Sequence, residues 1–184
     1  DVDPSGMSPD FFTRLQIPPV ATLINGATWD PTSRILNVSV KADFALAANS
    51  SYKLACVLTE DDVTGTGSGY NQSNAYAGGG NGVMGGFELL PSSVPAAQMV
   101  YDHVARAIAP SFTGEANSFP TTVLAGQSHT LNFSFTLPAT WDENSINIIG
   151  LLLNPEGGID NAGKATIAEA VANGYVAGLQ TIYG

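Results

Sequence analysis

Alternation of apolar and polar residues is the strongest pattern along this chain, and it predicts β-strands. Between residues 36 and 44 every second side chain is apolar, while the positions between them are mostly polar. The same period of two runs through residues 52–59 and 129–137, and an Asn49-Ser50 turn separates the first two runs. Because successive side chains of a strand point to opposite faces, each of these segments is expected to bury one face.

Other segments complete a set of about six main strands. Residues 146–153 are apolar on both faces, which is typical of a central strand. Residues 99–108 also fit a helix through Val100, Val104 and Ile108, but a strand is favoured. The remaining predicted strands are 20–24 and a short one at 87–90. Strands of this length, separated by turn-rich segments, predict a mostly β protein with an Ig-like antiparallel β-sandwich.

Helix signals occur near both ends. Ser8 is suited to the N-cap and Pro9 to the first position of a short helix through Leu15, which Pro18 and Pro19 then stop. A second short helix is predicted at 164–173, because Gly174 follows it as a stop signal. We expect residues 1–19 to be a linker or the remnant of an upstream region, and residues 20–184 to be one domain.

The segment 61–86 differs from the other predicted connections, because it is long, rich in glycine and without periodicity. Loops of more than about 12–15 residues are uncommon and usually functional or disordered. Gly80, Gly82 and Gly85 match the G-x-G-x-x-G dinucleotide fingerprint, which requires a strand before it and a helix after it. Neither is predicted here, so the match is interpreted as chance.

Composition and charge narrow the class of protein. Hydrophobic residues make up 44% of the 184 residues and charged residues only 12%, with a formal net charge of -10. So acidic a chain repels a phosphate backbone, which excludes nucleic acid as a partner. No apolar run reaches the about 18 residues of a transmembrane helix. Few lysines and a start at Asp1 rather than Met lead us to expect an exported protein whose targeting segment has been removed.

Reactive side chains are few and form no catalytic motif. Cys56 alternates with core residues, so a buried thiol of low reactivity is expected. His129 is placed at the rim of the core. His103 has no carboxylate spaced along the sequence to orient it, and Asp102 and Arg106 are spaced for a helical ion pair. A structural role is therefore predicted for both histidines.

The acidic residues Glu60, Asp61 and Asp62 are a candidate calcium site, since Ca²⁺ takes six to eight oxygen ligands. Their spacing does not match the EF-hand, in which acidic ligands alternate with other residues. Solvated carboxylates at the end of a strand are the favoured interpretation. No other metal and no cofactor is predicted.

Several short segments, in this order, resemble the Omp28-related outer-membrane protein family of Bacteroidetes-type bacteria. They lie between residues 36 and 162, and they are 58–65, 70–72, 102–106, 125–127, 141–144, 148–154 and 159–162. The resemblance implies an exported β-sandwich associated with the outer membrane or cell surface. It also implies that such a domain often follows a thioredoxin-like domain and often precedes a C-terminal sorting signal. The family carries no catalytic site that could be transferred to this chain.

The favoured function is a non-catalytic accessory or binding module that recognises carbohydrate or peptide through the 61–86 loop. Loops on rigid scaffolds commonly carry binding sites. Aromatic and amide side chains in the loop are the candidate contacts, namely Tyr70, Asn71, Gln72, Asn74 and Tyr76. A loop that only packs over the edge of the sandwich is given equal weight. Two further hypotheses are a structural spacer behind an upstream domain and a hydrolase using acids such as Glu143, Glu156 and Asp160.

Overall fold

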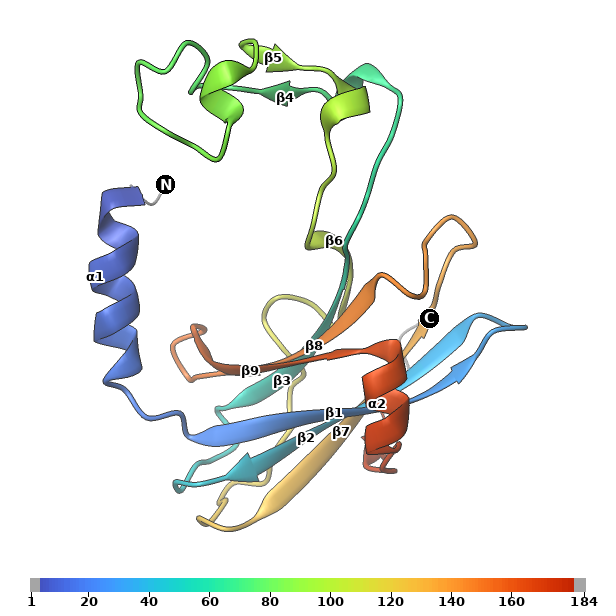
Figure 1. Ribbon diagram of the computed structural model, residues 1–184. Coiled ribbons are helices and arrows are strands. Elements are labelled where there is room, and N and C mark those ends of the chain that lie inside the picture. Colours follow the sequence, from blue (N-terminus) through green and yellow to red (C-terminus); the bar gives the residue numbers. More distant parts are fainter. Residues whose placement is uncertain (1–3, 181–184) are drawn as a thin grey trace.

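Two four-stranded sheets form the body of the protein in this computed structural model, which describes residues 4–180 (Figure 1). The strand orders are β1-β2-β7-β10 and β6-β3-β8-β9, and all neighbours are antiparallel except β7 and β10. The bounds are β1 Ala21–Asp30, β2 Ile35–Phe44, β3 Lys53–Glu60, β6 Val104–Ala109, β7 Ser128–Thr136, β8 Ile146–Leu153, β9 Ile159–Thr166 and β10 Leu179–Gln180. The predicted β-sandwich is confirmed.

One hydrophobic cluster joins the two sheets. It draws on alternate residues of β2 and β7 from one sheet and on β3 and β8 from the other. Phe133 is the largest of its fully buried side chains, at 1% exposed. Burying a side chain of this kind contributes about 1.5–3 kcal/mol, so the alternating pattern is the main source of stability here. Cys56 is fully buried in this cluster, and burial raises the pKa of its thiol, as the sequence predicts.

Three of the long strands of the sandwich differ from the sequence-based prediction. β1 continues to Asp30, well beyond residue 24, because its backbone pairs with the whole length of β2. β6 begins only at Val104, since His103 has a left-handed backbone conformation (φ 57°) that interrupts an extended strand. β9 was not predicted, because its sequence is small and polar; it forms because its backbone pairs with β8.

The two predicted helices exist, but both begin elsewhere than predicted. α1 spans Pro4–Leu15, so Pro9 lies inside the helix and Ser8 is not its N-cap. Pro4 also suits a first turn, which explains the earlier start. α2 spans only Ile167–Asn173, because the residues before it are taken by β9. Thr166 caps α2 through a reciprocal capping box with Glu169 and thereby fixes the boundary between strand and helix.

Residues 61–103, called the arm here, connect β3 to β6 and project away from the sandwich (Figure 1). The predicted 61–86 loop is therefore only the first part of a larger structured unit. The arm contains a two-residue antiparallel ladder and three short 3₁₀ segments. They are β4 Gln72–Ser73, β5 Ser93–Val94, η1 Ser68–Tyr70, η2 Phe87–Leu89 and η3 Ala96–Gln98. The strand predicted at 87–90 is wrong, because Gly86 (φ 99°) starts the tight η2 turn there.

Candidate functional site

The arm is joined to the sandwich by a narrow stem of two antiparallel segments. Val63 and Tyr101 form an isolated bridge, with both of their N–H···O distances at 2.9 Å. The backbone N–H of Asp62 donates to Asp102 Oδ1 at 3.0 Å. Both backbone and side-chain hydrogen bonds therefore fix the direction in which the arm leaves the sheets.

Asp61 is the central polar residue of this stem. Its carboxylate accepts hydrogen bonds from the backbone N–H of His103 at 2.7 Å and from Asn147 Nδ2 at 2.7 Å. These hydrogen bonds hold the pKa of the Asp61 carboxyl below its ordinary value. The Nδ1 atom of His103 also lies 3.0 Å from Asp61 Oδ1. The fold thus supplies the orienting carboxylate that the local sequence did not, and His103 makes a structural polar contact as predicted.

Glu60 is buried at the last position of β3, with 5% of its surface exposed. Its Oε2 accepts a hydrogen bond from Arg106 Nε at 2.6 Å, and its Oε1 accepts one from the backbone N–H of Asp142 at 2.8 Å. The Arg106 guanidinium also lies 5.6 Å from the ring centroid of Trp141. Arg106 therefore pairs with Glu60 across the sheet, and the Asp102–Arg106 pair suggested by the spacing is not formed.

The three acidic residues considered for calcium point to different partners. Glu60 is paired with Arg106 and Asp61 with His103 and Asn147, while Asp62 has a left-handed backbone conformation (φ 59°) that turns the chain. Among residues 4–180, no three side chains of His, Cys, Asp or Glu gather closely enough to hold a metal ion. The arrangement serves the stem of the arm and offers calcium no assembled ligand set.

An apolar groove of about 400 Å³ lies on the arm. Its walls come from β4, from the following turn, from η2 and from the returning segment before the stem. The lining residues are Gln72, Ser73, Asn74, Ala75, Tyr76, Met84, Phe87, Met99 and Tyr101. Flexible methionines beside aromatic rings give a surface that adapts to apolar side chains of differing shape.

Of the five predicted contact residues, Gln72, Asn74 and Tyr76 line this groove. Asn74, however, is buried: its Nδ2 donates to the carbonyls of Phe87 and Pro91, and its Oδ1 accepts from the N–H of Tyr76. Asn74 therefore holds the arm together rather than facing a ligand.

Asn71 and Tyr70 also serve the arm itself. Asn71 Oδ1 accepts from the backbone N–H of Ala96 at 2.9 Å, and the carbonyl of Tyr70 accepts from the hydroxyl of Tyr101 at 2.8 Å. The Tyr70 ring also covers Gly65 so closely that a Cβ added there would lie 2.4 Å from it. The structure thus places Gln72, Asn74 and Tyr76 at the groove, whereas Tyr70 and Asn71 make contacts within the arm.

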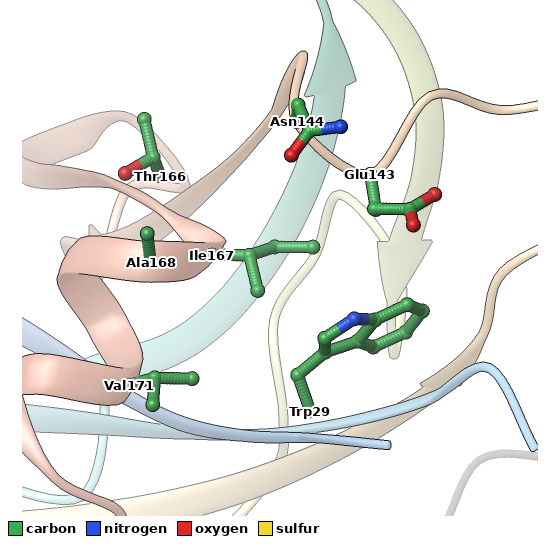
Figure 2. A pocket seen from close by; sticks show the side chains of 7 residues that line it. All are labelled: Trp29, Glu143, Asn144, Thr166, Ile167, Ala168 and Val171. Atoms are coloured by element: carbon green, nitrogen blue, oxygen red, sulfur yellow. The ribbon is translucent and has the colours of Figure 1, made fainter. Parts of the chain in front are cut away.

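A second cavity, of about 390 Å³, lies at one end of the sandwich between β1, the turn before β8 and the start of α2 (Figure 2). It is lined by Trp29, Glu143, Asn144, Thr166, Ile167, Ala168 and Val171. Figure 2 shows the Trp29 ring on one side of the space and the aliphatic side chains of α2 on another. Of these residues, sequence reasoning considered only Glu143 as a candidate functional residue.

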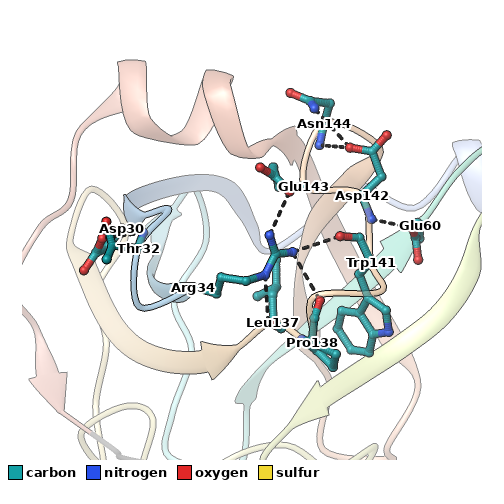
Figure 3. Close-up of polar contacts among 10 residues, drawn as sticks. All are labelled: Asp30, Thr32, Arg34, Glu60, Leu137, Pro138, Trp141, Asp142, Glu143 and Asn144. Atoms are coloured by element: carbon teal, nitrogen blue, oxygen red, sulfur yellow. Dashed lines mark hydrogen bonds and ion pairs between the residues drawn. The ribbon is translucent and has the colours of Figure 1, made fainter.

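Arg34 fixes the geometry beside this cavity (Figure 3). Its guanidinium donates to Glu143 Oε2 at 3.0 Å and to the carbonyl of Trp141 at 2.8 Å, and its Nε donates to the carbonyl of Leu137 at 3.0 Å. It also lies 5.6 Å from the ring centroid of Trp29. A backbone hydrogen bond at Glu143 itself lowers the pKa of the Glu143 carboxyl, together with the Arg34 side chain. A planar, permanently charged guanidinium is suited to hold several acceptors in fixed positions.

Most of the groove and cavity residues that sequence reasoning did not consider are apolar. Met84, Phe87, Met99 and Tyr101 come from separate stretches of the arm, and Trp29 lies at the end of a strand that was predicted too short. A usable signal was present, since large apolar residues within a glycine-rich segment have no strand or helix face to join. Their convergence on one groove depends on how the arm folds back.

Two packed, mostly antiparallel sheets define the class as a β-sandwich, and the arm is a structured insertion between β3 and β6. The family model described as outer membrane protein Omp28 matches residues 21–171, from the first residue of β1 to the middle of α2. The chain therefore belongs to the Omp28 outer membrane protein family, and the predicted resemblance is confirmed.

Membership in this family indicates a surface protein associated with the outer membrane. None of the helices within residues 4–180 has the length and apolar character that crossing a bilayer requires. The comparison with curated proteins gave no match, and neither did the comparison with solved structures.

Proposed function

We propose that this chain is a non-catalytic accessory module of the cell surface that binds an apolar peptide segment in the groove of the arm. The observation that carries the proposal is the groove of about 400 Å³ itself, which has mostly apolar walls and stands away from the sandwich. Pockets of about 300–1,000 Å³ are the usual size for small ligands and for a few side chains of a partner.

The lining favours peptide over carbohydrate at this groove. The Asn74 amide is engaged at both Nδ2 and Oδ1 inside the arm, and Asn71 Oδ1 accepts from the N–H of Ala96, so these groups are not available to sugar hydroxyls. Gln72 and Tyr76 remain as polar groups beside Met84 and Met99. Methionine side chains are common at surfaces that accept varied apolar partners.

The engagement of the acids supports a non-catalytic function. Glu143 is bound to Arg34, and Asp160 Oδ2 accepts the backbone N–H of Val20 at 2.8 Å. Glu156 lies in a turn beyond β8 and lines a different pocket from Glu143. The acids considered for a hydrolase thus serve separate parts of the fold, so a binding role is favoured over hydrolysis.

The Ig-like assignment and the exported context belong to the same proposal. The sheets β1-β2-β7 and β6-β3-β8-β9 are divided as in Ig-type sandwiches. In the Ig fold, strands C, F and G share one sheet, and variable-type domains add the strand after C to it. Here β3, β8 and β9 take the places of C, F and G, and β6 is the added strand. An exported, Bacteroidetes-type protein with an upstream thioredoxin-like domain is the setting we propose. The spacer hypothesis predicts that replacing residues 21–171 by an unrelated sandwich of similar size preserves the function of the full-length protein.

The groove is tested with a displayed library of random peptides, and a glycan array serves as the comparison. We expect apolar peptides to be enriched, and Met84→Ala or Tyr76→Ala to weaken their binding about tenfold, equivalent to about 1.4 kcal/mol. Val83→Ala is the matched control, because Val83 neighbours Met84, is 86% exposed and lies outside the groove. Enrichment of no peptide, or equal binding by the Met84 and Val83 variants, would contradict the proposal.

A further inference from the structure

We infer that the cavity beside Trp29 is a second binding site, separate from the arm, and that it accepts a neutral sugar ring. The cavity of about 390 Å³ is formed by β1, the turn before β8 and α2, and none of its lining residues belongs to the arm. A volume of this size accommodates one or two sugar rings. The inference does not depend on the function proposed for the arm.

The Trp29 indole supplies an apolar platform. Arg34 lies over the ring, 5.6 Å from its centroid, and thereby fixes the orientation of the indole. Figure 2 shows the ring bordering the cavity, with Ile167 and Val171 across from it. The C–H-bearing face of a sugar is apolar and can pack on such a platform, while its hydroxyl groups remain at the edges.

Polar groups at the rim are arranged as hydrogen-bond acceptors. Asn144 Nδ2 donates to Asp142 Oδ1 at 3.0 Å, so the amide is oriented, and Figure 2 shows its oxygen on the side of the cavity. Glu143, which also lines the cavity, accepts from Arg34 through Oε2. Carboxylate and amide oxygens each have more than one lone pair, so sugar hydroxyls can donate to both side chains.

The charge pattern selects a neutral ligand. Arg34 already neutralises Glu143 at 3.0 Å and occupies the cation position near the Trp29 ring, so a cationic ligand would have to compete with it. An anionic ligand would meet Glu143 in the lining and Glu169 in the first turn of α2, in a chain whose net charge is -10. A neutral glycoside avoids both penalties.

The experiment uses Trp29 as its own reporter. Because the chain has two tryptophans, a Trp141→Phe background leaves Trp29 as the single indole. Neutral methyl glycosides of glucose, galactose, mannose and N-acetylglucosamine are titrated up to about 50 mM, a range that covers the millimolar affinities of single sugar rings. Choline and methyl glucuronide are the cationic and anionic comparators.

Two substitutions on α2 form a matched pair. Ala168 lines the cavity and Ala172 lies on the same helix outside it, and both are exposed, so each tolerates a larger side chain. We expect at least one neutral glycoside to change Trp29 fluorescence saturably. Ala168→Phe should weaken that binding at least about tenfold, while Ala172→Phe leaves it unchanged. Asn144→Ala, on a different segment, should weaken it as well.

The inference is overturned by any of three results. They are no saturable response to the neutral glycosides, tighter binding of choline or methyl glucuronide, and equal binding by the two α2 variants. Met84→Ala in the arm should leave glycoside binding unchanged, so failure of the peptide proposal and failure of this one are distinguishable. Circular dichroism of each variant confirms that the sandwich is retained.

Discussion

The sandwich and the arm are stabilised in different ways, although one chain builds both. In the sandwich, long antiparallel ladders satisfy the backbone and a large apolar cluster fills the space between the sheets. In the arm, the β4–β5 ladder is only two residues long, and side chains take over the backbone's hydrogen bonds. Glu88, for example, accepts from the N–H groups of Met84 and Gly86, and Asn81 donates to the carbonyl of Ala75.

The glycines of the arm explain this difference. Gly78, Gly79, Gly82, Gly85 and Gly86 all have positive φ angles, which side-chain-bearing residues adopt rarely. Such turns allow the chain to fold back on itself but contribute no apolar side chain. The arm therefore buries few residues, with Val94 as its fully buried one among the described residues. A surface built this way can present a groove while adding little to the stability of the whole.

Removing core volume from the sandwich should have the largest effect. Phe133→Ala is expected to lower the free energy of unfolding by about 3–5 kcal/mol, because it leaves a cavity in the cluster between the sheets. Phe112→Ala is the control, since Phe112 is 80% exposed and should change stability by less than about 0.5 kcal/mol. Urea unfolding measures both, and equal effects of the two variants would contradict the described core.

Breaking the ion pair between Glu60 and Arg106, at the base of the arm, should have the next largest effect on stability. Glu60→Gln keeps an acceptor for the N–H of Asp142 but removes the charge that faces Arg106. We expect a loss of about 1.5–3 kcal/mol in urea unfolding, the range for hydrogen bonds to charged groups. Arg106→Gln combined with Glu60→Gln should lose less than the sum of the single variants. Additive losses would show that the two side chains do not interact.

Removing volume from the arm should act locally. Val94→Ala is expected to cost about 1–2 kcal/mol within the arm while leaving global unfolding of the sandwich almost unchanged. Hydrogen exchange should show lost protection at Tyr101 and Asn74, whose N–H groups are bonded within the arm, and not in β8. Val100→Ala, at a 56% exposed position, is the control. A fall in protection of β8 equal to that of the arm would show that the two regions unfold together.

Acid should loosen the stem of the arm. The pKa of Asp61 is lowered from an ordinary value of 3.8, so its stabilising contribution is complete above pH 3.8. That contribution is lost as the pH falls through the lower pKa of the folded state. NMR titration of the His103 and Asn147 signals should show this transition below pH 3.8. Asp61→Asn should abolish it, and its persistence in that variant would assign the transition to another group.

The sequence predicted the strands of the sandwich better than it predicted the structure of the arm. β2 was located within one residue, because its single buried face leaves a period of two in the sequence, and β8 was located because it is apolar on both faces. β9 was missed because its residues are small and polar, and pairing with β8 rather than burial makes it a strand. The η2 segment was predicted as a strand from its apolar composition, which does not report the positive φ of Gly86.

The candidate sites were predictable only in part. Tyr76 and Gln72 were selected as aromatic and amide residues of a long loop, and both line the arm groove. Asn71 and Asn74 have the same residue type as surface contacts, but their hydrogen bonds face inward. Residue type does not distinguish an asparagine that contacts a ligand from one that holds the arm together, because the amide can form its hydrogen bonds in either role.

The sequence by itself determined the sandwich, the family and the burial of Cys56. Alternation, composition and the order of short motifs can be recognised along the sequence without knowing which distant residues come into contact. Tertiary structure alone decided that Asp61 meets His103, that Glu60 meets Arg106, and that Trp29 faces the start of α2 across a cavity. These contacts join residues far apart in the chain. Their formation depends on the register of the sheets and the path of the arm, which no local pattern encodes.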